Sequence, residues 1–189
     1  MPVTTLDPTT ALIVIDLQAG IVGLPLAHPV DGVIARAVSL ARAFRDRQLP
    51  VVLVNVAGTP SGRTDADAGG GGRTLPVESI QLISELDQQP GDILVTKRAR
   101  SAFTETGLTE HLRALGVTQV VLAGISTSSG VESTARHAHE HGFNVTLAVD
   151  AMTDGKPESH DHSVATIFPR IGETGTTQEI LDLLRRSRS

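Results

Sequence analysis

Acidic and basic side chains stand directly after apolar runs at two places in the sequence. Asp16 and Gln18 follow the apolar run 11–15, and Lys97 ends the run 92–97. A carboxylate beside an ammonium in one pocket can exchange protons with a substrate, which is the chemistry of general acid–base catalysis. Each residue alone is more often a turn or surface group. The prediction therefore depends on whether the fold brings them together.

A third segment of interest is rich in glycine and serine. The sequence GISTSSG at 124–130 follows the apolar run 119–125 and leads into an amphipathic stretch at 128–141. Backbone N–H groups at such a strand-to-helix turn can bind an anion or stabilise a developing oxyanion. The same pattern also occurs as a plain turn or as a phosphate cradle, so it indicates a binding site without naming the ligand.

The elements that must position these residues alternate along the chain. Continuous apolar runs predict buried strands at 11–15, 50–56, 92–97, 119–125 and 144–150, with an edge strand at 166–169. Helical periodicity predicts helices at 30–47, 77–86, 108–115, 128–141, 160–165 and 177–186, with Gly116 closing the third. This order indicates an α/β fold, a doubly wound parallel sheet of five to six strands with helices on both faces, Rossmann-like and three-layered. Ligands bind at the carboxyl ends of such strands, where the three segments converge.

Composition limits the function classes. The 189 residues are 40% hydrophobic, and we interpret 1–189 as a single domain. A net charge of −5 and 2% aromatic residues argue against nucleic acid as a partner. The chain has no Cys, which excludes disulfides and a thiolate nucleophile. We see no signal peptide or membrane span and expect a cytoplasmic protein. The Gly-rich segment 58–76 is expected to be a mobile loop.

Several motifs together resemble a known family. They are IDLQ at 15–18, Lys97 followed by SAF at 101–103, GIST at 124–127 and VESTAR at 131–136. In this order, and over nearly the whole chain, they are similar to the isochorismatase-like hydrolases, a group that includes nicotinamidases and N-carbamoylsarcosine amidases.

The resemblance implies roles for individual residues. The family's amidases use an Asp, a Lys and a Cys, which map to Asp16, Lys97 and Gly130. Other members, true isochorismatases among them, carry Gly at the third position and resemble vinyl-ether hydrolases with an Asp general acid and water as nucleophile. True isochorismatases tend to have His at the position of Ser128. The family also has a cis peptide before the residue matching Ser126, and the amides of Ser126 and Gly130 would form the oxyanion or anion site.

We expect Gln18, Phe103 and Ser129 to line the substrate pocket. Burial raises the pKa of an Asp while a neighbouring ammonium lowers it, and the sequence leaves open which effect dominates at Asp16. The leading interpretation is a hydrolase of a small anionic metabolite that uses Asp16 in acid–base catalysis with water and forms no covalent cysteine intermediate. The alternative is a catalytically silent small-molecule binding protein derived from this family.

Other interpretations are weaker. A serine hydrolase would need a G-x-S-x-G elbow, and the segment at 124–128 lacks the second Gly. A nucleotide-binding domain would carry G-x-G-x-x-G after the first strand, which is absent here. Nicotinamidases carry an Asp-x-His-x-x-His metal site after the second strand, and residues 56–60 of this chain contain no His, so the resemblance implies no catalytic metal. We also expect no cofactor.

The histidines favour a surface interpretation. Of His137, His139 and His141, only the first and last share a helix face, so we interpret them as surface residues. His160 and His162 are expected to be solvated.

The last expectation concerns assembly. Leu24, Pro25 and Leu26 follow Asp16 in a stretch without a regular element. Exposed apolar residues near a pocket often complete an interface, and family members commonly associate. We therefore expect a homodimer or homotetramer.

Overall fold

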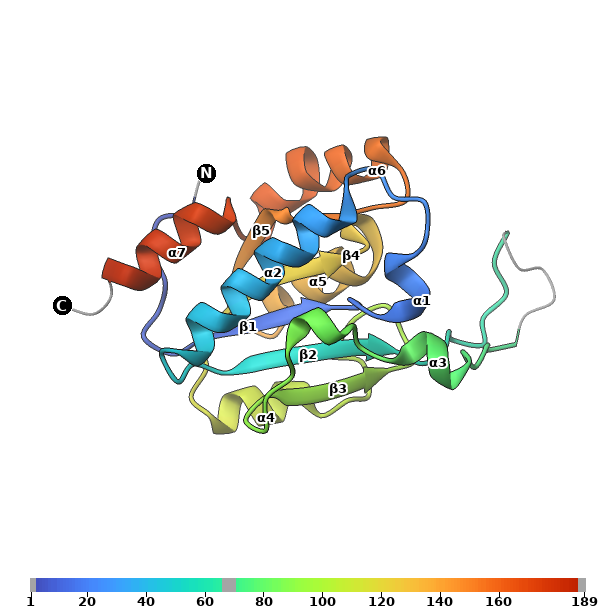
Figure 1. The fold of residues 1–189 in the computed structure, drawn as a ribbon, viewed down its shortest axis with the longest axis horizontal. Helices are drawn as coiled ribbons and strands as arrows, with labels where there is room; N and C mark the ends of the chain where they lie inside the picture. The colour runs from blue at the N-terminus through green and yellow to red at the C-terminus, as the bar shows by residue number, and fades with distance from the viewer. Residues whose placement is uncertain (1–2, 66–70, 187–189) are drawn as a thin grey trace.

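Six parallel strands form one sheet in the computed structural model, which describes residues 3–65 and 71–186. The strands are β1 (Thr10–Ile15), β2 (Val51–Val56), β3 (Ile93–Lys97), β4 (Gln119–Ile125), β5 (Asn144–Thr153) and β6 (Glu173–Gly175). Their spatial order is β3-β2-β1-β4-β5-β6, and every registered pair is parallel. The winding therefore reverses between β1 and β4, which confirms the doubly wound fold (Figure 1).

Helices cover both faces of this sheet because its strands are apolar on both sides. Along β1, Leu12 and Val14 belong to one hydrophobic core, while Ile13 and Ile15 belong to the other. The first core is covered by α2 (Val30–Arg45) and α7 (Thr177–Arg186), and the second by α4 (Leu108–Ala114) and α5 (Glu132–Glu140). Alternate side chains of a central strand thus point into opposite layers, as expected for a buried parallel strand.

The remaining helices are short and lie at the edges. They are α1 (Ala19–Val22), α3 (Val77–Ile80), α6 (Pro157–His162) and the single turns η1 (Ser84–Leu86), η2 (Thr127–Val131), η3 (Ser163–Ile167) and η4 (Phe168–Arg170). The helix predicted over 77–86 is therefore two short pieces. The helix predicted over 128–141 begins with the π-turn η2 before α5. Gly116 follows α4 with φ +71°, as expected for a C-terminal glycine.

The edge strand predicted at 166–169 is wrong, because these residues lie in the helical turns η3 and η4. Phe168 is fully buried, so its turn packs an aromatic ring against the core. Pro169 has no N–H to donate to a strand ladder, which disfavours a strand at this point. The true edge strand is β6, paired with β5.

The segment after β2 leads away from the sheet. Gly58 and Thr74 form an isolated antiparallel bridge at its base, and Figure 1 shows the described arms extending away from the body. Residues 66–70 of the expected mobile loop 58–76 lie outside the described residues. In the described ranges, no helix is long and apolar enough to cross a bilayer.

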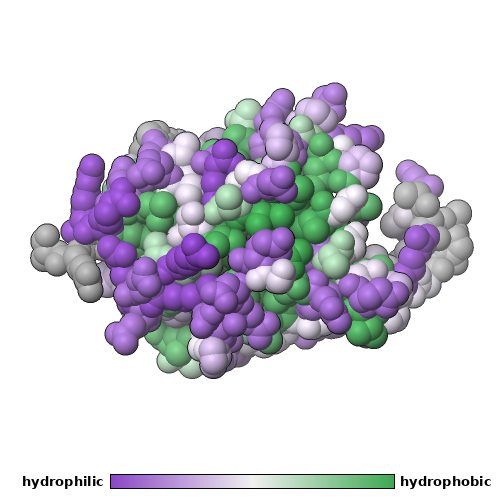
Figure 2. Space-filling model, viewed as in Figure 1, coloured by the Kyte–Doolittle hydropathy of each residue, from purple (hydrophilic) through white to green (hydrophobic). Residues whose placement is uncertain are grey.

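One face of the molecule carries apolar residues over α1 and α2 (Figure 2). We call this the α1–α2 surface and define it by Val22, Leu24, Leu26, Val30 and Ile34. Leu24 is 56% exposed, whereas the other four are partly buried against the core below them. Apolar residues that gather on one face can mark a surface that contacts another molecule.

Candidate active site

Asp16 and Lys97 meet at the carboxyl edge of the sheet. Lys97 is the last residue of β3 and its Nζ donates a 2.7 Å hydrogen bond to Asp16 Oδ2, across the end of β2. Asp16 follows β1 directly, and its N–H is bound by Val54 O at 2.9 Å. The exposed fractions are 4% for Asp16 and 2% for Lys97. The expected buried pair is therefore present.

Burial dominates the protonation of Asp16. Removal from water raises the pKa of Asp16 to about 6, although the charge and hydrogen bond of Lys97 lower it. Lys97 binds Oδ2 of this carboxyl, whereas Oδ1 is buried without a hydrogen-bond partner among the described residues. One oxygen of this carboxyl is thus fixed by the ammonium, and the other can hold or accept a proton.

The turn after β4 closes the site on the opposite side. Gly124 has φ +118°, and a Cβ there would lie 2.0 Å from Ile15 O, so only glycine lets β4 approach β1 this closely. The peptide between Ile125 and Ser126 is cis, as the family resemblance implied. After it comes the π-turn η2, in which a Cβ on Gly130 would lie 3.2 Å from Asp16 Oδ2. Position 130 therefore faces the Asp16 carboxyl.

A cavity of about 520 Å³ opens above these residues. It is lined from β1, β2 and β3, from the turn after β4, and from the base of the segment after β2: Asp16, Ile21, Val56, Gly58, Thr59, Pro60, Gly62, Thr64, Arg73, Lys97, Ala99, Arg100, Ile125, Ser126, Ser129 and Gly130. Three of these side chains are cationic and one is a carboxylate, so the walls carry an excess of positive charge. Arg100 donates a 2.8 Å hydrogen bond to Ser129 Oγ.

A family model, the isochorismatase domain, matches residues 10–179. The chain belongs to the isochorismatase family. It is 42% identical over 183 residues to the uncharacterized isochorismatase family protein YecD of Escherichia coli O157:H7, covering 93% of this chain and 96% of that protein. It is also 31% identical over 186 residues to a maleamate amidohydrolase of Pseudomonas putida, covering 93% and 86%.

Comparison with solved structures indicates the same family. An isochorismatase family protein from Burkholderia thailandensis superposes with a TM-score of 0.87 at 38% identity, covering 96% of this chain and 98% of that one. This protein is thus an isochorismatase-family hydrolase, related to amidohydrolases, and its chain contains no cysteine.

Two residues expected in the pocket of this isochorismatase-family protein lie elsewhere. Gln18 is fully buried and ties α3 to β2: its Nε2 donates to Val56 O and Ser79 O, and its Oε1 accepts from Val56 N. Phe103 packs in the core, with its ring centroid 6.0 Å from that of Phe143. Both are absent from the lining of the cavity, whereas Ser129 is part of it.

Asp154 braces the turn after β4 and was not predicted. Its Oδ2 accepts hydrogen bonds from Ser128 N at 2.7 Å and Ser128 Oγ at 2.8 Å. The strand was predicted to end at Asp150, but β5 continues to Thr153. The carboxylate at the carboxyl end of β5 is therefore Asp154, not Asp150. The apolar residues Ala151 and Met152 after Asp150 were the signal that could have revealed it.

His160 supports the same turn, and the expectation that it is solvated is wrong. It is buried, and its Nδ1 lies 2.8 Å from Thr127 Oγ1. Burial is the main cause that lowers the pKa of His160, which favours a neutral imidazole in this position. Because His160 is bonded to Thr127, it does not activate Ser126 in the way that a serine hydrolase requires. His162 is exposed.

His137 on α5 and His141 just after it were expected at the surface, but both are half-buried and contact side chains of the segment 101–109. His137 and His141 share a face, with ring centroids 5.4 Å apart, and their Nδ1 atoms lie 2.8 Å from Ser101 Oγ and Thr109 Oγ1 respectively. In residues 3–65 and 71–186, no three His, Cys, Asp or Glu side chains are placed to hold a metal ion.

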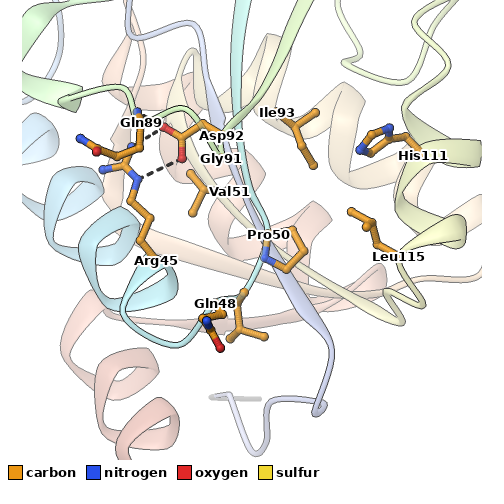
Figure 3. A pocket seen from close by; sticks show the side chains of 11 residues that line it. Arg45, Gln48, Pro50, Val51, Gln89, Gly91, Asp92, Ile93, His111 and Leu115 are labelled. Atoms are coloured by element: carbon orange, nitrogen blue, oxygen red, sulfur yellow. Dashed lines mark hydrogen bonds and ion pairs between the residues drawn. The ribbon is translucent and has the colours of Figure 1, made fainter.

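A second cavity, of about 440 Å³, lies at the opposite, amino edge of the sheet (Figure 3). It lies between the starts of β2 and β3 and the end of α2, and it contains the ion pair of Arg45 with Asp92, 2.7 Å between Nη2 and Oδ2. Asp92 also accepts the Gln89 N–H, so its carboxylate is occupied by structural contacts. Ligands of doubly wound sheets bind at the carboxyl edge, which makes the Asp16 cavity the candidate site.

Proposed function

We propose that this protein hydrolyses a small anionic metabolite by acid–base catalysis at Asp16, with water as the nucleophile and without a covalent enzyme intermediate. One observation carries the proposal: the buried Asp16 carboxyl has an oxygen with no hydrogen-bond partner in the described part of the chain, and it faces a glycine in a cationic cavity. Burial raises the pKa of Asp16 to about 6, within the range where a carboxyl both gives and takes protons near neutral pH.

The reaction balances with these groups alone. Protonated Asp16 gives its proton to the substrate at the bond that breaks, and water adds to the electron-deficient carbon. The proton released by that water then returns to Asp16. Lys97 stays an ammonium throughout and orients the carboxyl through Oδ2. The backbone amides of Ser126 and Gly130, at the cavity wall, would bind a substrate carboxylate or a developing negative charge.

The surroundings of Gly130 support a mechanism without a covalent step. The chain contains no Cys, and a Cβ at position 130 would lie 3.0 Å from Ile15 Cγ2 and 3.2 Å from Asp16 Oδ2. A side chain there would crowd the catalytic carboxyl. The glycine keeps that space open for a water molecule or the substrate.

Charge supports the anionic substrate. Asp16 compensates Lys97, and Arg100 has no ion-pair partner among the described residues, so it adds positive charge to the cavity wall of a protein whose net charge is −5. Two relatives are named for acting on anions, the maleamate amidohydrolase of Pseudomonas putida and a ureidoacrylate amidohydrolase of Methylobacterium radiotolerans. An anionic substrate would be attracted to such a cavity.

The test is hydrolysis of small carboxylates that carry an enol ether, an amide or a ureido group, by wild type and by Asp16→Asn. General acid–base catalysis contributes about 10²–10⁴-fold, so we expect the variant to lose at least about 100-fold in kcat while its circular dichroism is unchanged. If the variant keeps most of the activity, Asp16 is not the catalytic group. If wild type binds members of the set and hydrolyses none, the chain is the silent binding protein instead.

A further inference from the structure

The segment that follows Lys97 is anchored to α5. Ala102 N–H donates to Thr134 Oγ1 at 3.0 Å, and Ser101 Oγ lies 2.8 Å from His137 Nδ1. Ser101, Ala102 and Phe103 are all buried. This segment therefore runs from the end of β3 to α5 along a fixed path, and it holds the backbone of Arg100 beside the turn after β4.

Arg100 is positioned by this path. It lines the cavity, is exposed to solvent, and donates to Ser129 Oγ on the turn that also presents Ser126 and Gly130. A guanidinium has five N–H donors, and one of them is engaged in this bond. Among the described residues no carboxylate lies within ion-pair distance of Arg100. Its positive charge and most of its donors are therefore available to a ligand in the cavity.

We infer that Arg100, held by Ser129, is the receptor for a carboxylate group of the substrate and determines specificity for acids over neutral analogues. This inference rests on the proposed function only in using the same cavity. The bond to Ser129 Oγ fixes the guanidinium next to the turn amides, so that both face one oxyanion.

A carboxylate fits better than a phosphate. The fork of N–H groups on a guanidinium matches the two oxygens of a planar carboxylate. Because the Lys97 charge is compensated by Asp16, Arg100 would bind a ligand without help from that second cation, which suits the single charge of a carboxylate. The substrate carboxylate would lie beside Ser129, and the bond to be hydrolysed would lie over Asp16.

The test is equilibrium binding by calorimetry at low ionic strength. The probes are acetate, maleate and benzoate, each paired with its neutral amide, and inorganic phosphate. The proteins are wild type, Arg100→Gln, Arg100→Lys and, as a matched control, Arg98→Gln. Arg98 is two residues away, lies outside the cavity lining, and has a 3.4 Å contact with Thr74 Oγ1.

We expect wild type to bind at least one acid more tightly than its amide. Arg100→Gln should weaken that acid by about tenfold or more, as expected for a lost charge-assisted hydrogen bond, and leave the amide unchanged. Arg100→Lys should retain part of the affinity, since the charge stays and the fork is lost. Arg98→Gln should bind as wild type does.

Three results would overturn the inference. They are no acid preferred over its amide, an equal loss in the Arg98 variant, and phosphate bound more tightly than every carboxylate with the same dependence on Arg100. Because binding is measured without turnover, failure of the hydrolase proposal leaves this test intact. With a hydrolysed acid in hand, Arg100→Gln should raise KM by the same factor and leave kcat nearly unchanged.

Discussion

The carboxyl of Asp16 is placed where its two surroundings oppose each other. Water is excluded from it, which favours the neutral acid, while the Lys97 ammonium 2.7 Å away favours the carboxylate. The result is a pKa of about 6, so at pH 7 about one carboxyl in ten carries a proton. The pKa of Asp16 should therefore shift whenever the charge of Lys97 changes.

The pH dependence of hydrolysis should show this balance. Asp16 must be protonated to act as the acid, so we expect kcat/KM to be highest below about pH 6 and to fall about tenfold per pH unit above it. In Lys97→Met both influences that lower the pKa are lost and burial remains, so the fall should move to higher pH. The measurement is a pH–rate profile of both proteins. A profile that rises with pH would instead make Asp16 a base.

Protonation of Asp16 also affects stability, with the opposite sign to a usual salt-bridged carboxylate. The folded pKa lies above the unfolded value of 3.8, so the folded state holds this proton more tightly. The stabilisation from protonated Asp16 is complete below about pH 3.8 and is lost as pH rises through about 6. The group therefore favours the folded state at acidic pH.

A side chain at position 130 should crowd Ile15 and the carboxyl of Asp16. In Gly130→Ala the new Cβ would lie 3.0 Å from Ile15 Cγ2 and 3.2 Å from Asp16 Oδ2. We expect a loss of about 1–3 kcal/mol in the free energy of unfolding, from overpacking, together with a loss of hydrolysis. Urea denaturation and the hydrolysis assay measure the two effects. Unchanged stability and activity would show that the space beside Asp16 has no function.

Among the elements, the turn after β4 depends most on its neighbours. It is a π-turn whose amides bond back to Ser126 O, and it is also held from outside by Asp154, just after β5, and by His160 of α6. A turn supported from outside can be loosened without touching the residues that line the cavity. Substitution of these outside supports therefore tests the positioning of the turn separately from the chemistry of the residues that line the cavity.

Asp154→Ala should loosen the turn after β4. It removes the acceptor of the Ser128 N–H and hydroxyl, and we expect a loss of about 1–3 kcal/mol in the free energy of unfolding and a lower kcat. Asp150→Ala is the matched control, because Asp150 lies on β5, four residues before Asp154, and accepts from Thr177 N and Oγ1 at the start of α7. Denaturation should show both variants destabilised, and only Asp154→Ala should lose activity. Equal loss of kcat in both would argue against a positioning role.

Element positions were predictable from sequence where burial alone decides them. The continuous runs of β1 and β4 and the periodicity of α7 indicated these elements almost to the residue. The turns η3 and η4 were not predictable, because Phe168 is buried from a turn rather than from a strand. At the site, strand ends indicated Asp16 and Lys97. Arg100 was missed, since its position depends on the path that Ser101 and Ala102 follow to α5.

At the scale of the whole molecule, the α1–α2 surface is left without a covering element. Leu26 packs partly onto its own core, in the way expected of a residue that folds back, while Leu24 stays exposed. Nearby Ile21 lines the Asp16 cavity, so the surface and the cavity share α1. A partner bound here would lie close to the entrance of the site.

We propose that two copies of the chain associate through the α1–α2 surface, as a dimer or within a tetramer. Light scattering of wild type should show a multiple of the monomer mass of 19.8 kDa at micromolar concentration. Leu24→Asp should shift the population towards monomer by burying a charge at the interface. Val77→Asp is the matched control, since Val77 is 70% exposed on α3 and lies outside that surface. A wild-type monomer at all concentrations would contradict the proposal.

The glycine at position 130 has a consequence for the conditions in which the protein can work. A catalytic thiolate is oxidised stepwise by peroxide, and enzymes that depend on one lose activity irreversibly at the higher steps. This chain has no Cys, and Met152, one of its two methionines, is 2% exposed. A carboxyl and an ammonium are not oxidised under such conditions. Chemistry carried by Asp16 and Lys97 would therefore persist during oxidative stress that silences a cysteine-dependent relative.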